Sequence, residues 1–146
     1  MDAIVTKGHY FEELEVGQEA SYRRTVTEAD IQGFAEVSGD TNPVHLDETY
    51  AAGTPFKGRI AHGMLTASVI SAAIAGRLPG PGAVYLAQNL RFKAPARPGD
   101  TVHATVTVTA LDEVKRRASL STICTVNGKT VIDGDAVVMP TSRAKG

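Results

Sequence analysis

The sequence GMLTASVISAAIAGRL, at Gly63–Leu78, is apolar or small on nearly every face of a helix and contains no acidic residue. A run of this kind predicts an α-helix that is buried rather than amphipathic. At 1.5 Å per residue the helix would be roughly 24 Å long, and the PGPG sequence at 79–82 would end it. The run is too short and too rich in small residues for a membrane span, so we expect it in the core of a globular fold.

After this helix the period of the apolar residues changes to two, which is typical of β-strands. Strands are predicted at 83–95, 101–110, 116–126 and 129–139, with a weaker one at 17–28. Asn127-Gly128, between the last two, predicts a tight type I′ hairpin. The order favours an α+β fold in which a four-strand antiparallel meander curves around the buried helix. A single sheet has exposed edges, so we expect a homodimer that extends the sheet.

Two short helices are predicted ahead of the buried one. Thr27 has the position of an N-cap for a helix at Glu28–Val37, and Gly39 fits the end of that helix. Asp47 is placed to cap a second short helix that ends before the next proline. Asp40 therefore lies just beyond the first helix.

The length of the chain indicates a single domain over residues 1–146, since a chain of this length can bury a core without disulfides or metal. The net charge of −1 gives no reason to expect nucleic acid or a membrane as a partner. The single cysteine, Cys124, cannot form a disulfide within the chain, and the first residues lack the apolar core of a secretory signal. A cytoplasmic location is therefore expected.

The stretch SGDTNPVHLDETYAAGTPFKGRIAHGML, at 38–65, contains the candidate chemistry. Asp40 and His45 flank Asn42-Pro43, whose restricted backbone can direct both side chains into one cleft. A carboxylate and an imidazole together can hold a water molecule and divide the removal and delivery of its proton. The same residues are common turn formers, and a turn or cap is the commoner role of an isolated Asp in such a setting.

Gly63 lies at the predicted N-terminus of the buried helix, directly after His62. The backbone N–H there has no partner within the helix and carries the positive end of the helix dipole. Because glycine lets a ligand approach closely, this N–H could stabilise negative charge on an oxygen. His62 itself could be a simple helix cap. Together with Asp40 and His45, these parts suit the addition of water to an α,β-unsaturated thioester.

Other kinds of site are disfavoured by residue types and spacings. The four histidines lack zinc-ligand spacing, and one cysteine cannot supply a thiolate cluster. His9 and His103 fall in a predicted loop and a predicted strand, where we expect them to face solvent. The sequence contains no glycine-rich dinucleotide motif and no phosphate-binding loop. We therefore expect no metal and no cofactor.

Three segments resemble the MaoC-like (R)-specific enoyl-CoA hydratase family. They are SGDTNPVHLDETYA at 38–51, FKGRIAHGML at 56–65, and the small-residue helix that follows. The D-x-N-P-x-H element combined with A-H-G-M is far more specific than either half. The resemblance covers most of the chain and implies a hot-dog fold, in which an antiparallel sheet wraps around a long central helix and usually forms a dimer through the sheet.

The resemblance also implies roles for particular residues. Asp40 and His45 would be the catalytic pair, and the amide of Gly63 would donate to the thioester oxygen. His62 and Ser71 would be further substrate-binding residues. Basic residues that could contact the phosphates of CoA are Lys57, Arg59, Arg91, Lys93 and Arg97.

The activity implied is (R)-specific hydration of trans-2-enoyl-CoA to (R)-3-hydroxyacyl-CoA, reversible as a dehydration, with acyl-CoA as the partner. Dehydration of acyl-carrier-protein thioesters in fatty-acid synthesis is an alternative with the same chemistry. A hot-dog thioesterase is another, although Gly63–Leu78 lacks the carboxylate that such enzymes commonly use. A non-catalytic acyl-binding subunit is a fourth possibility, which an intact acid/base pair disfavours.

Several properties stay open at the level of the sequence. They are the acyl chain length, the order in which Asp40 and His45 handle protons, and the pathway, whether polyhydroxyalkanoate synthesis, β-oxidation or short-chain CoA metabolism.

Overall fold

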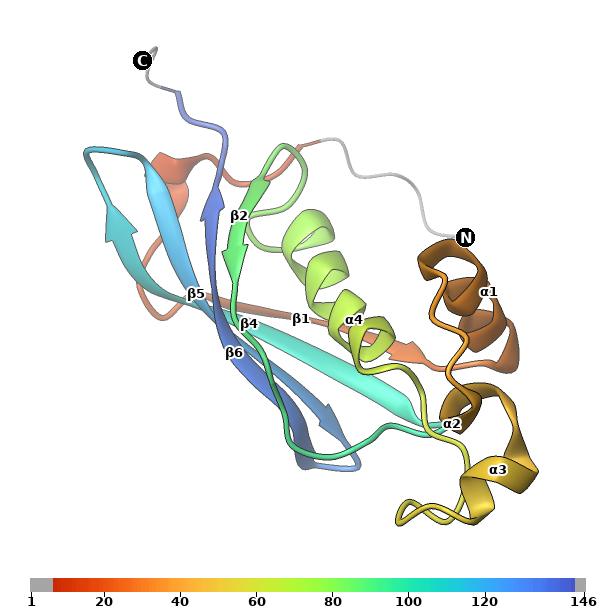
Figure 1. Ribbon diagram of the computed structural model, residues 1–146. Coiled ribbons are helices and arrows are strands. Elements are labelled where there is room, and N and C mark those ends of the chain that lie inside the picture. Colours follow the sequence, from red (N-terminus) through yellow and green to blue (C-terminus); the bar gives the residue numbers. More distant parts are fainter. Residues whose placement is uncertain (1–6, 144–146) are drawn as a thin grey trace.

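A computed structural model describes residues 7–143 of the chain, shown in Figure 1. In chain order the elements are η1 (Phe11–Glu13, a 3₁₀ helix), β1 (Glu19–Thr25), α1 (Glu28–Ser38), α2 (Pro43–Leu46), α3 (Glu48–Ala52), α4 (Gly63–Gly76), β2 (Val84–Gln88), β3 (Arg91–Phe92), β4 (Thr101–Asp112), β5 (Arg117–Val126) and β6 (Lys129–Met139). The strands form one antiparallel sheet in the order β1-β4-β5-β6-β2, and β3 also pairs with β6. The ends of the predicted single domain, residues 1–6 and 144–146, lie outside the described residues.

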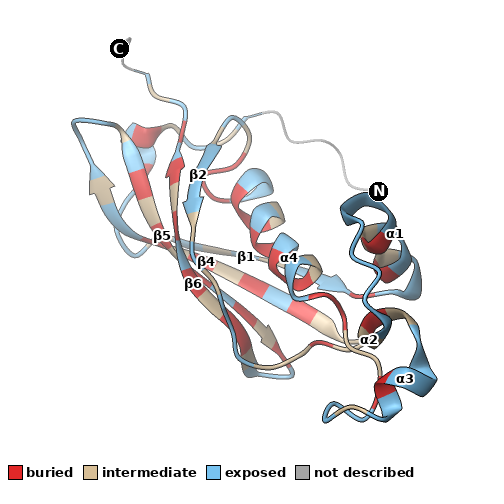
Figure 2. Cartoon of the chain, in the orientation of Figure 1, coloured by how far each residue is buried: buried red, intermediate tan, exposed pale blue. Residues whose placement is uncertain are grey.

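The predicted central helix forms as α4, although it ends at Gly76 rather than Leu78. Its buried side packs against β1, β4 and β5 (Figure 2) and consists of Thr66, Ala67, Val69, Ile70, Ala73 and Ile74. The opposite side is an exposed stripe at helical spacing, made of Met64, Ser68, Ser71 and Ala75. The prediction that this helix is buried on nearly every face is therefore wrong for a single chain, because a single sheet covers only one side of a helix. Within residues 7–143 no helix is long and apolar enough to cross a membrane.

The predicted meander is confirmed for β4, β5 and β6, which follow one another in the sheet. The hairpin between β5 and β6 has the predicted turn residues, with φ of 50° at Asn127 and 78° at Gly128. Positive φ at both positions is what a type I′ turn requires. Local signals in the sequence therefore predict this half of the sheet correctly.

The place predicted for the first strand of the meander is wrong. The strand predicted at 83–95 is two separate strands, β2 and β3, and both pair with β6 instead of β4. Since β4 already has β1 and β5 as neighbours, the segment after α4 cannot pair with β4 and instead joins the sheet at its edge, beside β6. A register shift between Tyr85 and Ala87 breaks the alternation, and Val84, Leu86 and Phe92 are exposed at this edge.

The helix caps predicted from the sequence are present. Thr27 and Asp30 form a reciprocal capping box at the start of α1, and Gly39 ends α1 with a φ of 77°. Asp47 caps α3. The segment expected as a turn also contains a one-turn helix, α2, which is capped by the side chain of Asn42. These caps fix the loops that surround the start of α4 in Figure 1.

Gly134 in β6 is a tightly restricted position. A Cβ atom there would lie 1.9 Å from the backbone oxygen of Asn89, in the connection between β2 and β3. Because backbone cannot easily yield, Gly134→Ala should displace this edge of the sheet and lower the free energy of unfolding in urea by about 3 kcal/mol. Gly33→Ala in α1 is the matched control, since the described residues leave the space around its added methyl open. Equal stability of Gly134→Ala and the wild type would contradict the strand placement.

Candidate active site

Four of the five predicted site residues line one pocket of about 470 Å³ at the N-terminal end of α4. They are Asp40, His45, His62 and Gly63. Ser71 lies about two turns further along α4 and lines a second pocket of about 580 Å³, between α4 and β2. Met64 borders both pockets, so they are neighbours along the exposed side of α4.

His45 projects from α2 with one of its two ring nitrogens occupied. Nδ1 donates to the carbonyl oxygen of Ile60 at 2.8 Å. Because a carbonyl can only accept, Nδ1 carries the proton and Nε2 is the basic nitrogen. His45 is buried but lines the pocket. Nε2 is therefore the atom that can take a proton from a molecule bound there.

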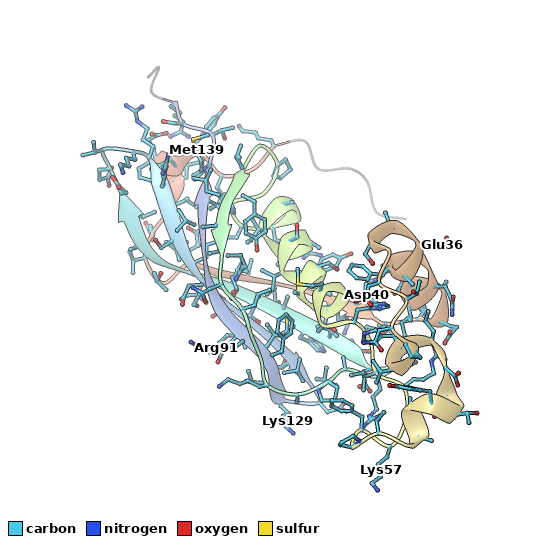
Figure 3. The ribbon with its side chains drawn as sticks, viewed as in Figure 1. Glu36, Asp40, Lys57, Arg91, Lys129 and Met139 are labelled. Atoms are coloured by element: carbon cyan, nitrogen blue, oxygen red, sulfur yellow. The ribbon has the colours of Figure 1, made fainter. Side chains whose placement is uncertain are left out.

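Asp40 lies in the bend between α1 and α2, on the side that faces α4 (Figure 3). Its N–H donates to Oγ of Ser38 at 3.1 Å, and its Oδ1 accepts from the N–H of Asn42 at 3.2 Å. The residue itself remains exposed. Polar side-chain atoms of Asp40, His45 and His62 all lie within 4.8 Å of one another, a separation that one water molecule can bridge.

His62 lies behind Asp40 and His45, and only 1% of it is exposed. Its Nε2 donates to the backbone oxygen of Asp40 at 2.9 Å. Its ring stacks on the ring of His45, with centroids 4.0 Å apart. His62 occupies the N-cap position of α4, but within the described residues its side chain makes no capping bond. The structure thus brings His62 to the site as a neighbour of the pair, and its contact with substrate stays a prediction.

Gly63 is the first residue of α4, so its N–H cannot be paired inside the helix. The helix dipole adds partial positive charge at this end. The ring of Phe92, from β3, lies directly over Gly63, where a Cβ atom would come within 2.7 Å of a ring carbon. Glycine allows this close approach. The site therefore combines a helix N-terminus suited to anionic oxygen with an apolar cover, beside Asp40 and His45.

Arg59, one of the basic residues considered for CoA, makes protein contacts beside His45. Its Nε donates to the carbonyl oxygen of His45 at 2.7 Å, and its terminal nitrogens bind both carboxylate oxygens of Glu28 at 2.7 and 3.0 Å. Arg59 thereby ties α1 to the backbone that presents His45. The hydrogen bonds from Arg59 hold the pKa of the Glu28 carboxyl below its usual range. Because Glu28 and Arg59 lie 31 positions apart, no local spacing could reveal this pair.

The other basic candidates for CoA binding mostly have protein partners. Arg97 donates to the carbonyl oxygen of Phe56 at 2.6 Å. Arg91 and Lys93 both pair with Asp133, at 2.8 and 3.0 Å. Lys57 is exposed, and Lys93 also lines the first pocket. Of these five basic residues, Lys93 is the one that lines the first pocket.

Asp40, His45 and His62 form the one group of three potential metal ligands found in residues 7–143. An imidazole binds zinc in its ring plane at about 2.0–2.1 Å. Here the two ring planes are stacked with 29° between them, so their lone pairs do not converge on one point. The geometry suits proton transfer better than metal binding. His9 and His103 are exposed, as predicted.

The antiparallel sheet around α4 defines a hot-dog fold, and its pocket has the parts of an acid/base site. The sequence matches the model of the MaoC like domain over residues 11–132, and the chain belongs to this family. Both the fold and the family expected from the sequence are thus confirmed.

Relatives and solved structures agree with this placement. An (R)-specific enoyl-CoA hydratase from Rhodospirillum rubrum is 57% identical over 135 residues, which cover 92% of this chain and 94% of the relative. A 3-hydroxybutyryl-CoA dehydratase from Methylorubrum extorquens is 51% identical over 88% of this chain and 82% of its own. The solved (R)-hydratase from A. caviae, involved in PHA biosynthesis, matches with a TM-score of 0.86 at 45% identity, over 88% of this chain and 98% of that one.

The Glu28–Arg59 pair should make stability depend on pH in one direction. Because the folded-state pKa of Glu28 is lowered, its contribution is present above the unfolded pKa and is lost as pH falls through the folded pKa. Glu28→Gln should therefore lower the free energy of unfolding at pH 7, by less than about 1 kcal/mol for a pair this exposed. The difference from the wild type should shrink as the pH falls through the folded-state pKa of Glu28. Glu36→Gln, on the exposed side of the same helix, should match the wild type throughout this titration. A deficit of Glu28→Gln that grows as pH falls would contradict the pairing.

Proposed function

We propose that the protein catalyses the (R)-specific hydration of trans-2-enoyl-CoA to (R)-3-hydroxyacyl-CoA and the reverse dehydration. The observation that carries this function is the placement of a carboxylate, a basic imidazole nitrogen and the N-terminus of α4 around one pocket. The hydratase and dehydratase relatives support the same hydro-lyase class. The chemistry needs a base, an acid and an oxyanion donor, and the pocket offers all three.

In the forward reaction, a water molecule held between Asp40 and His45 loses a proton to this pair as its oxygen attacks Cβ of the enoyl group. The electrons of the double bond shift toward the thioester oxygen, which gains enolate-like charge. The N–H of Gly63 and the dipole of α4 stabilise that charge. The pair then delivers a proton to Cα, so that water is added across the double bond. Asp40 and His45 act as one unit, and the order of the two transfers between them stays open.

We propose that the acyl chain binds in the second pocket, between α4 and β2. That pocket continues from the first past Met64, and its walls include Ala67, Leu86 and Leu90. Apolar walls suit an alkyl chain, whose burial is favourable by about 0.8 kcal/mol per methylene. Ser71 lies within this pocket, so its predicted substrate contact is with the acyl chain rather than with the thioester.

The same site can accept an enoyl group carried by CoA or by an acyl carrier protein. Relatives that act on CoA thioesters favour CoA. A thioesterase is disfavoured because α4 contains no carboxylate. In the cytoplasm the product would serve PHA biosynthesis, as in the A. caviae relative.

The first test of the function is hydration of crotonyl-CoA, followed by loss of the ultraviolet band of the conjugated enoyl thioester. A chiral assay should identify the product as the (R)-3-hydroxy thioester. Asp40→Asn and His45→Ala should each lower kcat/KM by at least about 100-fold, because each removes one half of the proton-transfer pair. Thr49→Ala, in α3 outside the pocket, is the control and should behave as the wild type.

Release of free thiol instead of hydration would indicate a thioesterase. Binding of acyl-CoA without turnover would indicate a binding subunit. Turnover only with carrier-protein thioesters would indicate that the substrate is an acyl-carrier-protein thioester and not an acyl-CoA. Folded variants of Asp40 and His45 with nearly full activity would refute the proposed mechanism.

We also propose that the protein is a homodimer that pairs across β2. β2 is an edge strand, and Val84, Tyr85 and Leu86 are 47%, 39% and 41% exposed along it. Unpaired edges with apolar side chains are favourable sites for pairing with a second chain. The exposed stripe of α4 lies on the same side, across the second pocket. Pairing here would cover both.

Val84→Arg should shift the dimer toward monomer, because the substitution places a charge at the proposed interface. Light scattering after size-exclusion chromatography would measure the mass. Val114→Arg is the matched control, since Val114 is 91% exposed in the turn between β4 and β5, and β6 separates β5 from β2 in the sheet. A wild-type monomer, or a Val84→Arg variant that stays dimeric at low concentration, would refute this interface.

A further inference from the structure

We infer that His62 is a positioning residue that fixes Asp40 and His45 relative to each other and to the start of α4. The inference rests on the proposed function, because it concerns the geometry of the same reaction. It assigns His62 a role behind the pair rather than at the substrate, in keeping with its 1% exposure.

The bond from His62 is the long-range hydrogen bond that locates Asp40. Residues 39–42 belong to neither a helix nor a strand. The bonds of Asp40 to Ser38 and Asn42 are local and shape the bend, but they do not place the bend against the rest of the molecule. The bond from Nε2 of His62 to the backbone oxygen of Asp40, at 2.9 Å, spans 22 positions. Since Gly63 follows His62 directly, this bond sets the distance between the carboxylate and the oxyanion donor.

The ring of His62 also supports the ring of His45. His62 stacks on His45 at 4.0 Å between centroids and 29° between planes, and Phe34 from α1 contacts His62 at 4.8 Å. The stack covers a face of the His45 ring and leaves its nitrogens at the ring edge. One of these nitrogens is held by Ile60, and the other is available to the pocket. Stacking therefore resists tilting of the His45 ring without occupying the basic nitrogen.

The hydrogen bonding of the two ring nitrogens of His62 distinguishes a positioning role from simple packing. Nε2 carries the proton, because its partner is a carbonyl oxygen. Nδ1 is buried, and within the described residues it has no hydrogen-bond partner. A buried polar atom without a partner is destabilising, and a phenylalanine ring would occupy similar space without that cost. What the imidazole supplies and phenylalanine cannot is the donor to Asp40.

Two substitutions divide the functions of His62. His62→Phe keeps a ring for stacking but removes the donor, whereas His62→Gln places an amide nitrogen near Nε2 and loses the ring. With the native fold checked by circular dichroism and thermal unfolding, His62→Phe should lower kcat for crotonyl-CoA by about 10- to 100-fold, the effect expected of a misplaced catalytic group. KM should change by less than about 3-fold, because the substrate is not contacted. His62→Gln should recover at least part of the lost kcat.

The controls keep this inference separate from the proposed function. An active wild type and an inactive Asp40→Asn variant establish the hydratase, and an inactive wild type refutes that function whatever His62 does. With an active wild type, a folded His62→Phe variant with wild-type kcat would overturn the positioning role. A rise in KM with unchanged kcat would instead assign His62 to the substrate. If His62→Phe does not fold, His62→Met, which also lacks the donor, takes its place. Failure of both to fold, with a folded His62→Gln, would make His62 a folding residue and overturn the inference.

Discussion

The packing of α4 against the sheet is the constraint on which the rest of the structure depends. Ile70 and Ala73 are fully buried, and the alternating apolar residues of β4 and β5 meet them from the sheet. Burial of a large aliphatic side chain contributes about 1.5–3 kcal/mol, so the orientation of α4 is strongly determined. That orientation carries the first turn of α4 to the edge of the core, where its unpaired N–H groups face the pocket and the loops beside it.

The loops that complete the pocket are held mainly through their own backbone carbonyls. His45 binds the carbonyl oxygen of Ile60, His62 binds that of Asp40, and Arg59 binds that of His45. Backbone carbonyls that do not belong to a helix or a sheet need other hydrogen-bond donors, and here side chains of the same site are the donors. These bonds give the loop carbonyls hydrogen-bond partners. They also set the tautomers of both histidines, which leaves Nε2 of His45 unprotonated and able to accept a proton.

The parts of the fold that local chemistry determines could be predicted from the sequence. The capping box at Thr27, the hairpin at Asn127-Gly128 and the alternation in β4 and β5 follow from neighbouring residues, and the structure contains all of them. The placement of Asp40, His45 and Gly63 around one pocket was predictable because they belong to one short stretch with a restrictive proline.

What the sequence did not reveal depends on contacts between distant segments. β2 pairs with β6 because β4 has no free edge, which is a property of the assembled sheet and not of residues 84–88. The binding of Arg59 by Glu28 and the approach of Phe92 to Gly63 likewise join elements that no spacing relates. The exposed stripe of α4 was missed for a similar reason. The composition of α4 is typical of a buried helix, but the fraction of a helix that is covered depends on the number of sheets that pack against it.

In the proposed dimer, that exposed stripe would connect the assembly of the protein to its chemistry. In the proposed reaction, the N–H of Gly63 would stabilise the charge on the thioester oxygen more strongly when water is excluded, because the local dielectric constant is lower. In one chain, Met64 is 56% exposed and Phe92 is 54% exposed, so the cover over the start of α4 is incomplete. A second chain across β2 would lie beside Met64 and would close the second pocket on its open side. The same apolar edge that favours dimerisation would then complete the low-dielectric environment that the reaction requires.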